Sequence, residues 1–151
     1  MTVRLYGASR TALIYVVASA TGFLASSAAG AFLAFLPGPL AGGPLTLGAS
    51  AAIFGLLGAM IHYGRRAGSQ ALGAHAARYA IILGVLGVIL PGVDNWAHAG
   101  GFAGGYVASR WLDPLVPERP HHFLLALVAL GASVLAVVVS VVHGLRLLGQ
   151  G

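Results

Sequence analysis

The sequence predicts an all-α polytopic membrane protein, and its composition and long uncharged runs carry that prediction. Of its 151 residues, 58% are hydrophobic and only 7% are charged, and the mean hydropathy is +0.91. Soluble domains typically carry about 25% charged residues, and this chain cannot supply so polar a surface. Its apolar residues lie in long runs, and a membrane-spanning helix needs roughly 20 in succession. We therefore expect several helices that cross a lipid bilayer.

Five spans are expected, because charges, glycines and prolines divide the apolar sequence. The first, residues 11–36, contains no charge and ends in a loop rich in proline and glycine. The second, 45–63, ends before a glycine and a pair of arginines. The third, 76–90, is short and ends at Pro91.

The fourth expected span, residues 95–111, is the richest in glycine and lies between Asp94 and Asp113. The fifth, 123–148, is long and consists largely of valine and leucine. The first run exceeds the roughly 7 to 15 apolar residues of a signal-peptide core, so we expect a span there rather than a cleaved signal. All five spans are assigned to one membrane domain over residues 1–151.

The arginines indicate how these spans are oriented. With five spans, the N-terminus and the loops after the second and fourth spans lie on one side of the membrane. Seven of the eight basic residues fall on that side: Arg4, Arg10, Arg65, Arg66, Arg78, Arg110 and Arg119. Because basic residues concentrate in cytoplasmic loops, the sequence predicts a multi-pass protein of a bacterial cytoplasmic membrane, with its N-terminus inside and its C-terminus outside.

Cysteine content and charge exclude several classes of function. The chain has no cysteine, which excludes disulfides, thiolate metal sites and a cysteine nucleophile. Its net charge of +5 is explained by the arginines of the inner loops, so no nucleic-acid partner is expected. The lipid bilayer is the partner that the composition implies.

His98 is the ionisable side chain that lies deepest in an expected span, one turn inside the fourth. Ionisable groups within a membrane are costly and are therefore functional candidates, although a lone histidine there is more often a packing residue. At 100° per residue, His98 shares a helix face with Gly101, Phe102, Gly105 and Ser109. Glycines four residues apart let another helix approach closely, so this face is expected to pack tightly.

The second span offers a matching surface of small residues with a serine at its edge. At 1.5 Å per residue, Ser50 is expected roughly 7 Å below the outer end of its helix, a depth similar to that of His98. The two side chains are therefore expected to meet. The small residues are Gly48, Ala51, Ala52, Gly55, Gly58 and Ala59.

A serine beside a histidine is the minimum apparatus for nucleophilic acyl transfer, because the imidazole takes the hydroxyl proton during the attack. The alternative for Ser50 is a hydroxyl bonded back to a carbonyl of its own helix. We expect that simpler bond for Ser19, Ser26, Ser27, Ser133 and Ser140.

Asp94 precedes His98 by four residues, close enough to suggest a Ser–His–Asp triad. Aspartate and asparagine are also preferred helix caps, and Asp94 and Asn95 stand where the fourth helix is expected to begin. We therefore expect Asp94 to cap this helix rather than to act in catalysis.

Two segments resemble the motifs of the rhomboid intramembrane serine proteases. Residues 48–51, Gly-Ala-Ser-Ala, resemble the family's Gly-x-Ser-Gly segment, and residues 97–101, Ala-His-Ala-Gly-Gly, look like its Ala-His-x-Gly-Gly segment. The order of the motifs also fits, with a short basic inner loop and one helix between them. The resemblance implies a rhomboid-like helical bundle in which Ser50 is the nucleophile and His98 is the general base and acid.

The resemblance also implies cleavage of other membrane proteins within or beside their transmembrane helices, with no metal or organic cofactor. Gly48, Ala51, Gly101 and Gly105 are then expected to support the oxyanion or the packing of the site. The match begins at the third of the family's six core helices, so the first two are expected to be absent. The family's His-x-x-x-Asn pair, which helps to hold the oxyanion, has no counterpart before Ser50, and Ala51 stands where the family usually has glycine.

Two other functions stay open from the sequence alone. A non-catalytic rhomboid-like protein that binds membrane proteins would keep the scaffold without the oxyanion pair. A small channel or transporter subunit would also use glycine-rich helices, but these spans contain no chain of charges that defines a path.

Overall fold

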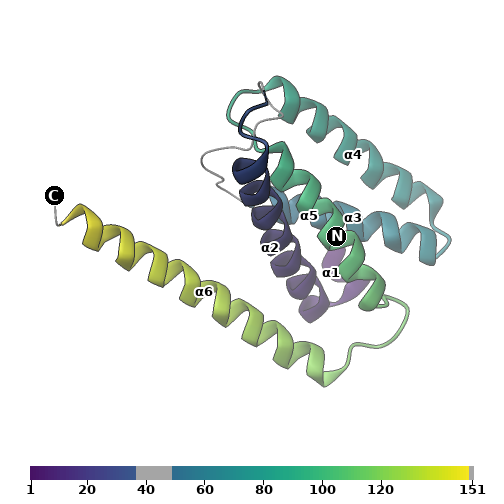
Figure 1. The fold of residues 1–151 in the computed structure, drawn as a ribbon. Helices are drawn as coiled ribbons and strands as arrows, with labels where there is room; N and C mark the ends of the chain where they lie inside the picture. The colour runs from purple at the N-terminus through teal and green to yellow at the C-terminus, as the bar shows by residue number, and fades with distance from the viewer. Residues whose placement is uncertain (37–48, 150–151) are drawn as a thin grey trace.

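The protein is described by a computed structural model over residues 1–36 and 49–149, and these residues form helices joined by short turns. In chain order the helices are α1 (Thr2–Tyr6), α2 (Ala8–Phe32), α3 (Ser50–Arg66), α4 (Gln70–Ile89), α5 (Asn95–Trp111) and α6 (Pro120–Leu148). Figure 1 shows α2, α3 and α5 grouped in a bundle, α4 along its flank and α6 leaving it at an angle. The predicted all-α fold class is confirmed.

The first two expected spans correspond to α2 and α3, with different ends. α2 begins before residue 11 and ends at Phe32, because residues 33–36 form a turn. α3 begins at Ser50 instead of residue 45. Residues 37–48, which include the expected start of the second span, lie outside the described part of the chain.

The other three expected spans correspond to α4, α5 and α6. The fourth has the predicted bounds, since Asp94 and the turn at Asp113 mark its ends. α6 begins three residues earlier than expected, at Pro120. α4 begins at Gln70 rather than residue 76, so Arg78 lies about two turns inside this helix instead of near its start.

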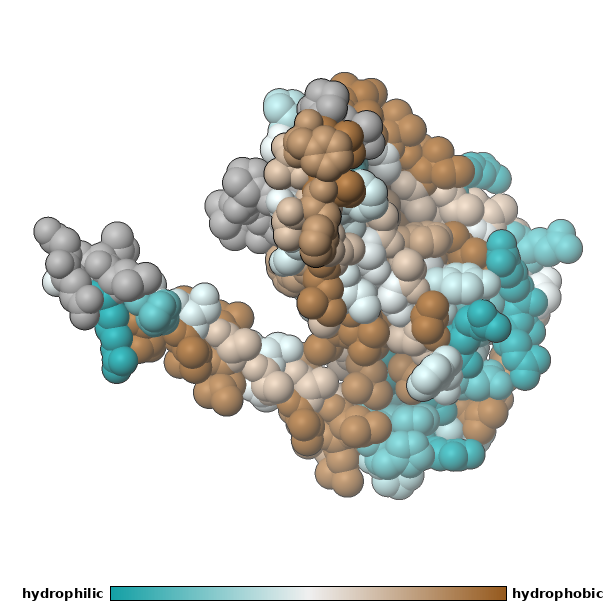
Figure 2. Space-filling view, in the orientation of Figure 1, coloured by the Kyte–Doolittle hydropathy of each residue, from teal (hydrophilic) through white to brown (hydrophobic). Residues whose placement is uncertain are grey.

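The helices differ in length and in hydropathy. Among the described residues, α2, α4 and α6 are long and apolar enough to cross a membrane. α3 and α5 contain 17 residues each and lie inside the bundle. Figure 2 shows hydrophobic side chains along α6, and hydrophilic ones at the end of the bundle where α5 ends and α6 begins.

α5 packs against α3 through glycines that bring the two backbones together. A Cβ on Gly101 would stand only 2.9 Å from the Cα of Ala51, and one on Gly105 would overlap the backbone of Gly55. The two helices run in the same direction, because residues 51 and 55 meet residues 101 and 105 in order. This confirms the predicted tight packing of the His98 face.

A second glycine face of α5 packs against α2. A Cβ on Gly100 would stand 2.6 Å from the carbonyl oxygen of Thr21, and one on Gly104 would overlap the Thr21 side chain. The Thr21 hydroxyl lies 3.0 Å from the carbonyl oxygen of Gly100. The two overlapping Gly-x-x-x-Gly pairs of α5 therefore serve two different neighbours.

α1 is a short helix that the sequence analysis did not predict, because five residues are too few to show a hydrophobic period. It packs Tyr6, which is 2% exposed, beside Ile14 and Ala59. The Tyr6 hydroxyl donates a 2.8 Å hydrogen bond to the carbonyl oxygen of Ala59 on α3. Burial raises the pKa of Tyr6 to about 12, so the hydroxyl keeps its proton at physiological pH and continues to donate.

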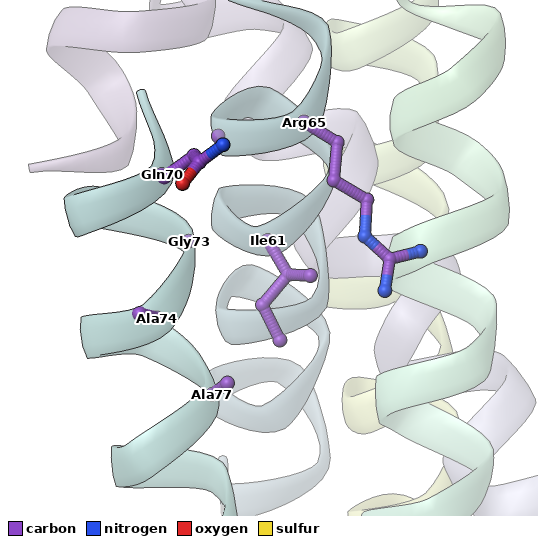
Figure 3. A pocket seen from close by; sticks show the side chains of 7 residues that line it. Ile61, Arg65, Gln70, Gly73, Ala74 and Ala77 are labelled. Carbon is purple, nitrogen blue, oxygen red and sulfur yellow. The ribbon is translucent and has the colours of Figure 1, made fainter. Parts of the chain in front are cut away.

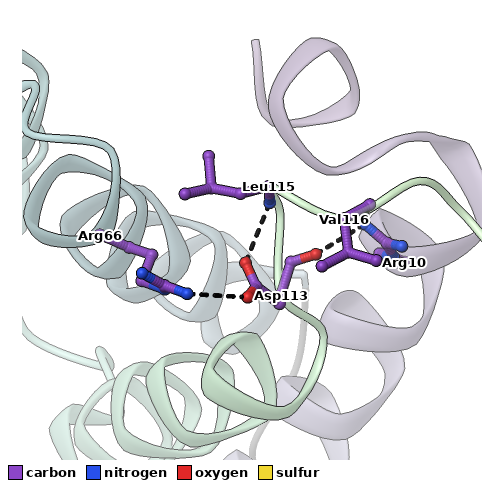
Figure 4. Close-up of polar contacts among 5 residues, drawn as sticks. All are labelled: Arg10, Arg66, Asp113, Leu115 and Val116. Carbon is purple, nitrogen blue, oxygen red and sulfur yellow. Dashed lines mark hydrogen bonds and ion pairs between the residues drawn. The ribbon is translucent and has the colours of Figure 1, made fainter.

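Arg10 is buried, with 3% exposed, although its sequence position suggested an inner-loop arginine. Its guanidinium donates to the carbonyl oxygens of Asp113 and Val116 at 2.8 and 2.7 Å (Figure 4), and to that of Pro117 at 2.6 Å. Its backbone N–H donates to the Glu118 carboxylate at 2.9 Å. Arg10 therefore holds the loop between α5 and α6 against the start of α2.

Asp113 connects the same loop to the end of α3. Its carboxylate accepts from the backbone N–H of Leu115 at 3.0 Å and from the Arg66 guanidinium at 3.2 Å (Figure 4). The backbone hydrogen bond, followed by Arg66, holds the pKa of Asp113 below its usual range. Because the ion pair is exposed to water, it contributes little to stability.

Single cysteines test the predicted orientation without background, because the chain contains none of its own. Ser69 lies between α3 and α4, on the side of the membrane that is expected to be cytoplasmic. Pro91 lies between α4 and α5, on the side that is expected to be outside the cell. We expect a membrane-impermeant maleimide to label Pro91→Cys in intact cells, and Ser69→Cys only after the cells are opened. Labelling of Ser69→Cys in intact cells would contradict the predicted orientation.

The glycine contact between α3 and α5 predicts a strong effect of one methyl group. Gly101→Ala forces the helices apart, and we expect it to lower the free energy of unfolding in detergent micelles by about 1 to 3 kcal/mol. Gly131→Ala is the matched control, because no atom lies within 4 Å of a Cβ at that position. It should leave stability unchanged or raise it slightly; equal losses in the two variants would show that the contact is not tight.

Candidate active site

Ser50 and His98 both lie near the N-terminal ends of their helices. Ser50 is the first residue of α3 and is half-buried. The expectation that it lies more than a turn inside its helix was therefore wrong, because α3 begins later than the apolar pattern suggested. Gly48, which was expected to support the nucleophile, lies outside the described residues.

His98 lies in the first turn of α5, and only 8% of it is exposed. Its ring stacks on that of Phe54 from α3, with the centroids 4.2 Å apart and the planes 16° from parallel. The imidazole Nδ1 is buried and has no hydrogen-bond partner within residues 1–36 and 49–149. Aromatic packing is thus the main contact that orients this ring.

Phe54 also relates His98 to Ser50. It follows Ser50 by four residues, so the two side chains project from the same face of α3, one above the other. The residue that stacks on His98 is therefore the neighbour of Ser50 along that face. By this periodicity, Ser50 lies on the face of α3 that carries Phe54.

The depth of the two residues follows from the adjacent backbone contact. Ala51 lies against Gly101, and α3 and α5 run in the same direction, so Ser50 is level with the residue that precedes Gly101. His98 stands two residues before that level, about 3 Å along the axis at 1.5 Å per residue. Ser50 and His98 consequently lie at nearly the same depth.

A cavity of about 380 Å³ lies beside His98, between α3, α4 and α5. Its volume falls within the range of ligand-binding clefts, roughly 300 to 1,000 Å³. Asn95 and His98 are its polar side chains, and the rest of the lining is Phe54, Ala80, Ile81, Gly84, Ala99 and Phe102. The cavity is therefore an apolar space in which the imidazole is one of few reactive groups.

Asp94 caps α5, as the sequence predicted. Its carboxylate accepts a 2.9 Å hydrogen bond from the backbone N–H of Ala97, and it also accepts one from the hydroxyl of Ser26 on α2. The sequence suggested only a carbonyl of its own helix as the acceptor for Ser26, and the Asp94 carboxylate is an acceptor on another helix. These contacts fix the start of α5 against α2.

Asn95, the next residue, joins the start of α5 to α4. Its side-chain Nδ2 donates a 3.0 Å hydrogen bond to the carbonyl oxygen of Gly87. From the sequence Asn95 was expected only at the start of this helix, although a polar residue three positions before His98 shares its helix face. That spacing is the signal by which it could have been found.

A second cavity, of about 290 Å³, lies between α3 and α4 near the turn that joins them (Figure 3). Arg65 at its edge turns toward α5, where its guanidinium donates to the Tyr106 hydroxyl at 3.1 Å. Within the described part of the chain, no three His, Asp or Glu side chains could hold a metal ion together. The space beside His98 is the stronger candidate for a site, because a buried imidazole lines it.

Comparisons with known proteins show the family of the chain. A family model described as "Rhomboid domain" matches residues 1–113. This chain belongs to the rhomboid family. The match covers α1 to α5 of this rhomboid, and α6 lies beyond it. Family membership and the apolar helices together identify an integral membrane protein.

Two curated relatives agree with that assignment. Rhomboid protease GluP of Bacillus subtilis (strain 168) is 36% identical over 112 residues, which are 72% of this rhomboid and 20% of the relative. RHOMBOID-like protein 4 of Arabidopsis thaliana is 34% identical over 123 residues, or 79% of this chain and 27% of the relative. The chain thus spans about a fifth to a quarter of the length of these relatives. No solved structure matches it.

Two substitutions at Asp94 test its capping role. Asp94→Ala removes the acceptor for both Ala97 and Ser26, and we expect the free energy of unfolding in micelles to fall by about 1 to 2 kcal/mol. Asp94→Asn keeps an acceptor oxygen and should retain most of that stability. Chemical denaturation measures both; an asparagine variant as unstable as the alanine variant would argue against capping.

Proposed function

We propose that this chain carries the catalytic dyad of an intramembrane serine endopeptidase, with Ser50 as the nucleophile and His98 as the general base and acid. The observation that carries the proposal is the stacking of Phe54 on His98. It orients the imidazole beside the face of α3 on which Ser50 lies. The protein then acts in a bacterial cytoplasmic membrane, with its N-terminus inside.

The dyad accounts for hydrolysis of a peptide bond in two steps. The Ser50 Oγ attacks the carbonyl carbon while the His98 Nε2 takes the hydroxyl proton, and the imidazolium then protonates the leaving amine nitrogen. The products are a free amine and an acyl ester on Ser50. In the second step, the imidazole takes a proton from water, the resulting hydroxide attacks the ester, and the proton returns to Ser50.

The start of α3 supports this chemistry by stabilising negative charge. The first backbone N–H groups of an α-helix have no acceptor within the helix, and this end carries partial positive charge. At α3 those groups begin at Ser50 and Ala51. One donor to a developing oxyanion is worth about 2.7 to 4 kcal/mol in the transition state, so they offer part of what a His-x-x-x-Asn pair supplies elsewhere in the family.

The surroundings of the dyad favour transmembrane segments as substrates. The cavity beside His98 is lined almost wholly by apolar groups, which suit a chain that comes from the bilayer. One relative is itself described as a rhomboid protease. Helices of other membrane proteins are therefore the partners that we propose.

An activity-based probe tests the dyad. We expect a fluorophosphonate to label the detergent-solubilised protein, and Ser50→Ala to abolish labelling because it removes the attacking oxygen. His98→Gln should slow labelling by about 10²- to 10⁴-fold, the usual contribution of a general base.

Ser133→Ala is the matched control, because the Ser133 hydroxyl bonds to the Ala129 carbonyl of its own helix at 2.8 Å. It should label like the unmodified protein. Undiminished labelling of Ser50→Ala, with every variant folded, would refute Ser50 as the nucleophile.

A further inference from the structure

The buried Nδ1 of His98 is the feature that the proposed dyad does not use. This nitrogen has no hydrogen-bond partner among the described residues, whereas roughly nine in ten buried polar groups have one. A general-base histidine also needs its Nδ1 to carry the proton, so that Nε2 is free to accept one. An acceptor close to Nδ1 would meet both requirements.

The space beside Gly87 of α4 places such an acceptor near His98. A Cβ on Gly87 would stand 2.6 Å from the Asn95 Oδ1 and 3.4 Å from the His98 Nδ1. Both atoms thus border the same small space, and they are at most about 6 Å apart. One water molecule bridges such a separation with two ordinary hydrogen bonds.

The Asn95 amide is oriented for this role by its other end. Its Nδ2 donates to the Gly87 carbonyl oxygen at 3.0 Å, while its Oδ1 borders the space that His98 shares. A side chain larger than hydrogen at residue 87 would fill this space. Glycine at residue 87 therefore keeps this space open, and asparagine at residue 95 supplies both the donor to Gly87 and the oxygen that faces the space.

We propose that Asn95 is a positioning residue for His98: its Oδ1 accepts the Nδ1–H proton, directly or through one water, and so keeps Nε2 free to take the Ser50 proton. The catalytic part of this proposal rests on the proposed function. The tautomer of His98 is nevertheless a property of the folded protein, whether or not Ser50 reacts.

Among the described residues, the other side chains around the imidazole do not offer an equivalent acceptor. α3 contributes the Phe54 ring, and α4 contributes Gly84 and Gly87, none of which titrates. Asp94 is the charged group that acts on His98 among the described residues. Its carboxylate already accepts from the Ala97 N–H and the Ser26 hydroxyl.

Two substitutions at Asn95 distinguish a residue that positions His98 from one that only attaches α5 to α4. Asn95→Asp keeps an oxygen toward His98 but loses the N–H that bonds Gly87, whereas Asn95→Ala loses both. Gly87→Ala fills the shared space, and Gly131→Ala on α6 is its control, because no atom lies within 4 Å of a Cβ there. A residue that only attached α4 would make Asn95→Asp as damaging as Asn95→Ala.

The experiment is ¹⁵N NMR of histidine-labelled protein in micelles, with the His98 signals assigned by their loss in His98→Gln, together with the pH dependence of fluorophosphonate labelling. We expect neutral His98 to carry its proton on Nδ1. Asn95→Asp should raise the midpoint of His98 titration by about 1 pH unit, because a nearby carboxylate favours the imidazolium. The acid limb of labelling should move upward with it.

Asn95→Ala and Gly87→Ala should shift the tautomer toward Nε2–H and slow labelling at least about tenfold, while Gly131→Ala should change neither. An unchanged tautomer in Asn95→Ala, or the same titration midpoint in Asn95→Asp and the unmodified protein, would overturn the proposal. If no variant is labelled at any pH, the proposed function fails instead, and the NMR result still decides the role of Asn95.

Discussion

The structure depends on the close packing of α5 against two helices at once. This packing is possible because the residues of α5 at both contacts are glycines, which have no side chain to keep the backbones apart. Gly101 and Gly105 bring its backbone against α3, and Gly100 and Gly104 bring it against α2. Inside a bilayer, lipid is as apolar as leucine, so helices associate through close packing and hydrogen bonds rather than by escaping water. The position of His98 relative to Ser50 is a direct result of this packing, because each residue occupies a fixed place on one of the packed helices.

Polar contacts around the start of α5 refine what the glycines establish. Ser26 bonds to Asp94 from α2, and Asn95 bonds to Gly87 on α4, so two flanking helices hold the turn that carries His98. Reactive groups on helices are held more precisely than reactive groups on loops, provided that neighbouring side chains fix them. The imidazole meets this condition, since Phe54 covers its face.

The sequence predicted the parts of this fold that depend on residues close together in the chain. The bounds of α5 were predictable because Asp94 caps one end and a turn follows the other, and the glycine spacing predicted its packing. The start of α4 was placed too late, because Gln70 and the residues after it are less apolar than a span usually is, and α3 starts later than its apolar pattern suggested. The partners of Ser26 and Arg10 could not be foreseen, because they lie 68 and more than 100 residues away and no periodicity encodes them.

The Arg10 contacts have a consequence for how the chain matures. The guanidinium belongs to α2, whereas the carbonyl oxygens of Asp113, Val116 and Pro117 are made more than 100 residues later. Until then, the guanidinium lacks these acceptors, and burying a cation without partners is costly in free energy. The loop between α5 and α6 therefore completes the environment of Arg10 only after α2 to α5 have been synthesised, and a chain that stops before residue 113 leaves this guanidinium without these three acceptors.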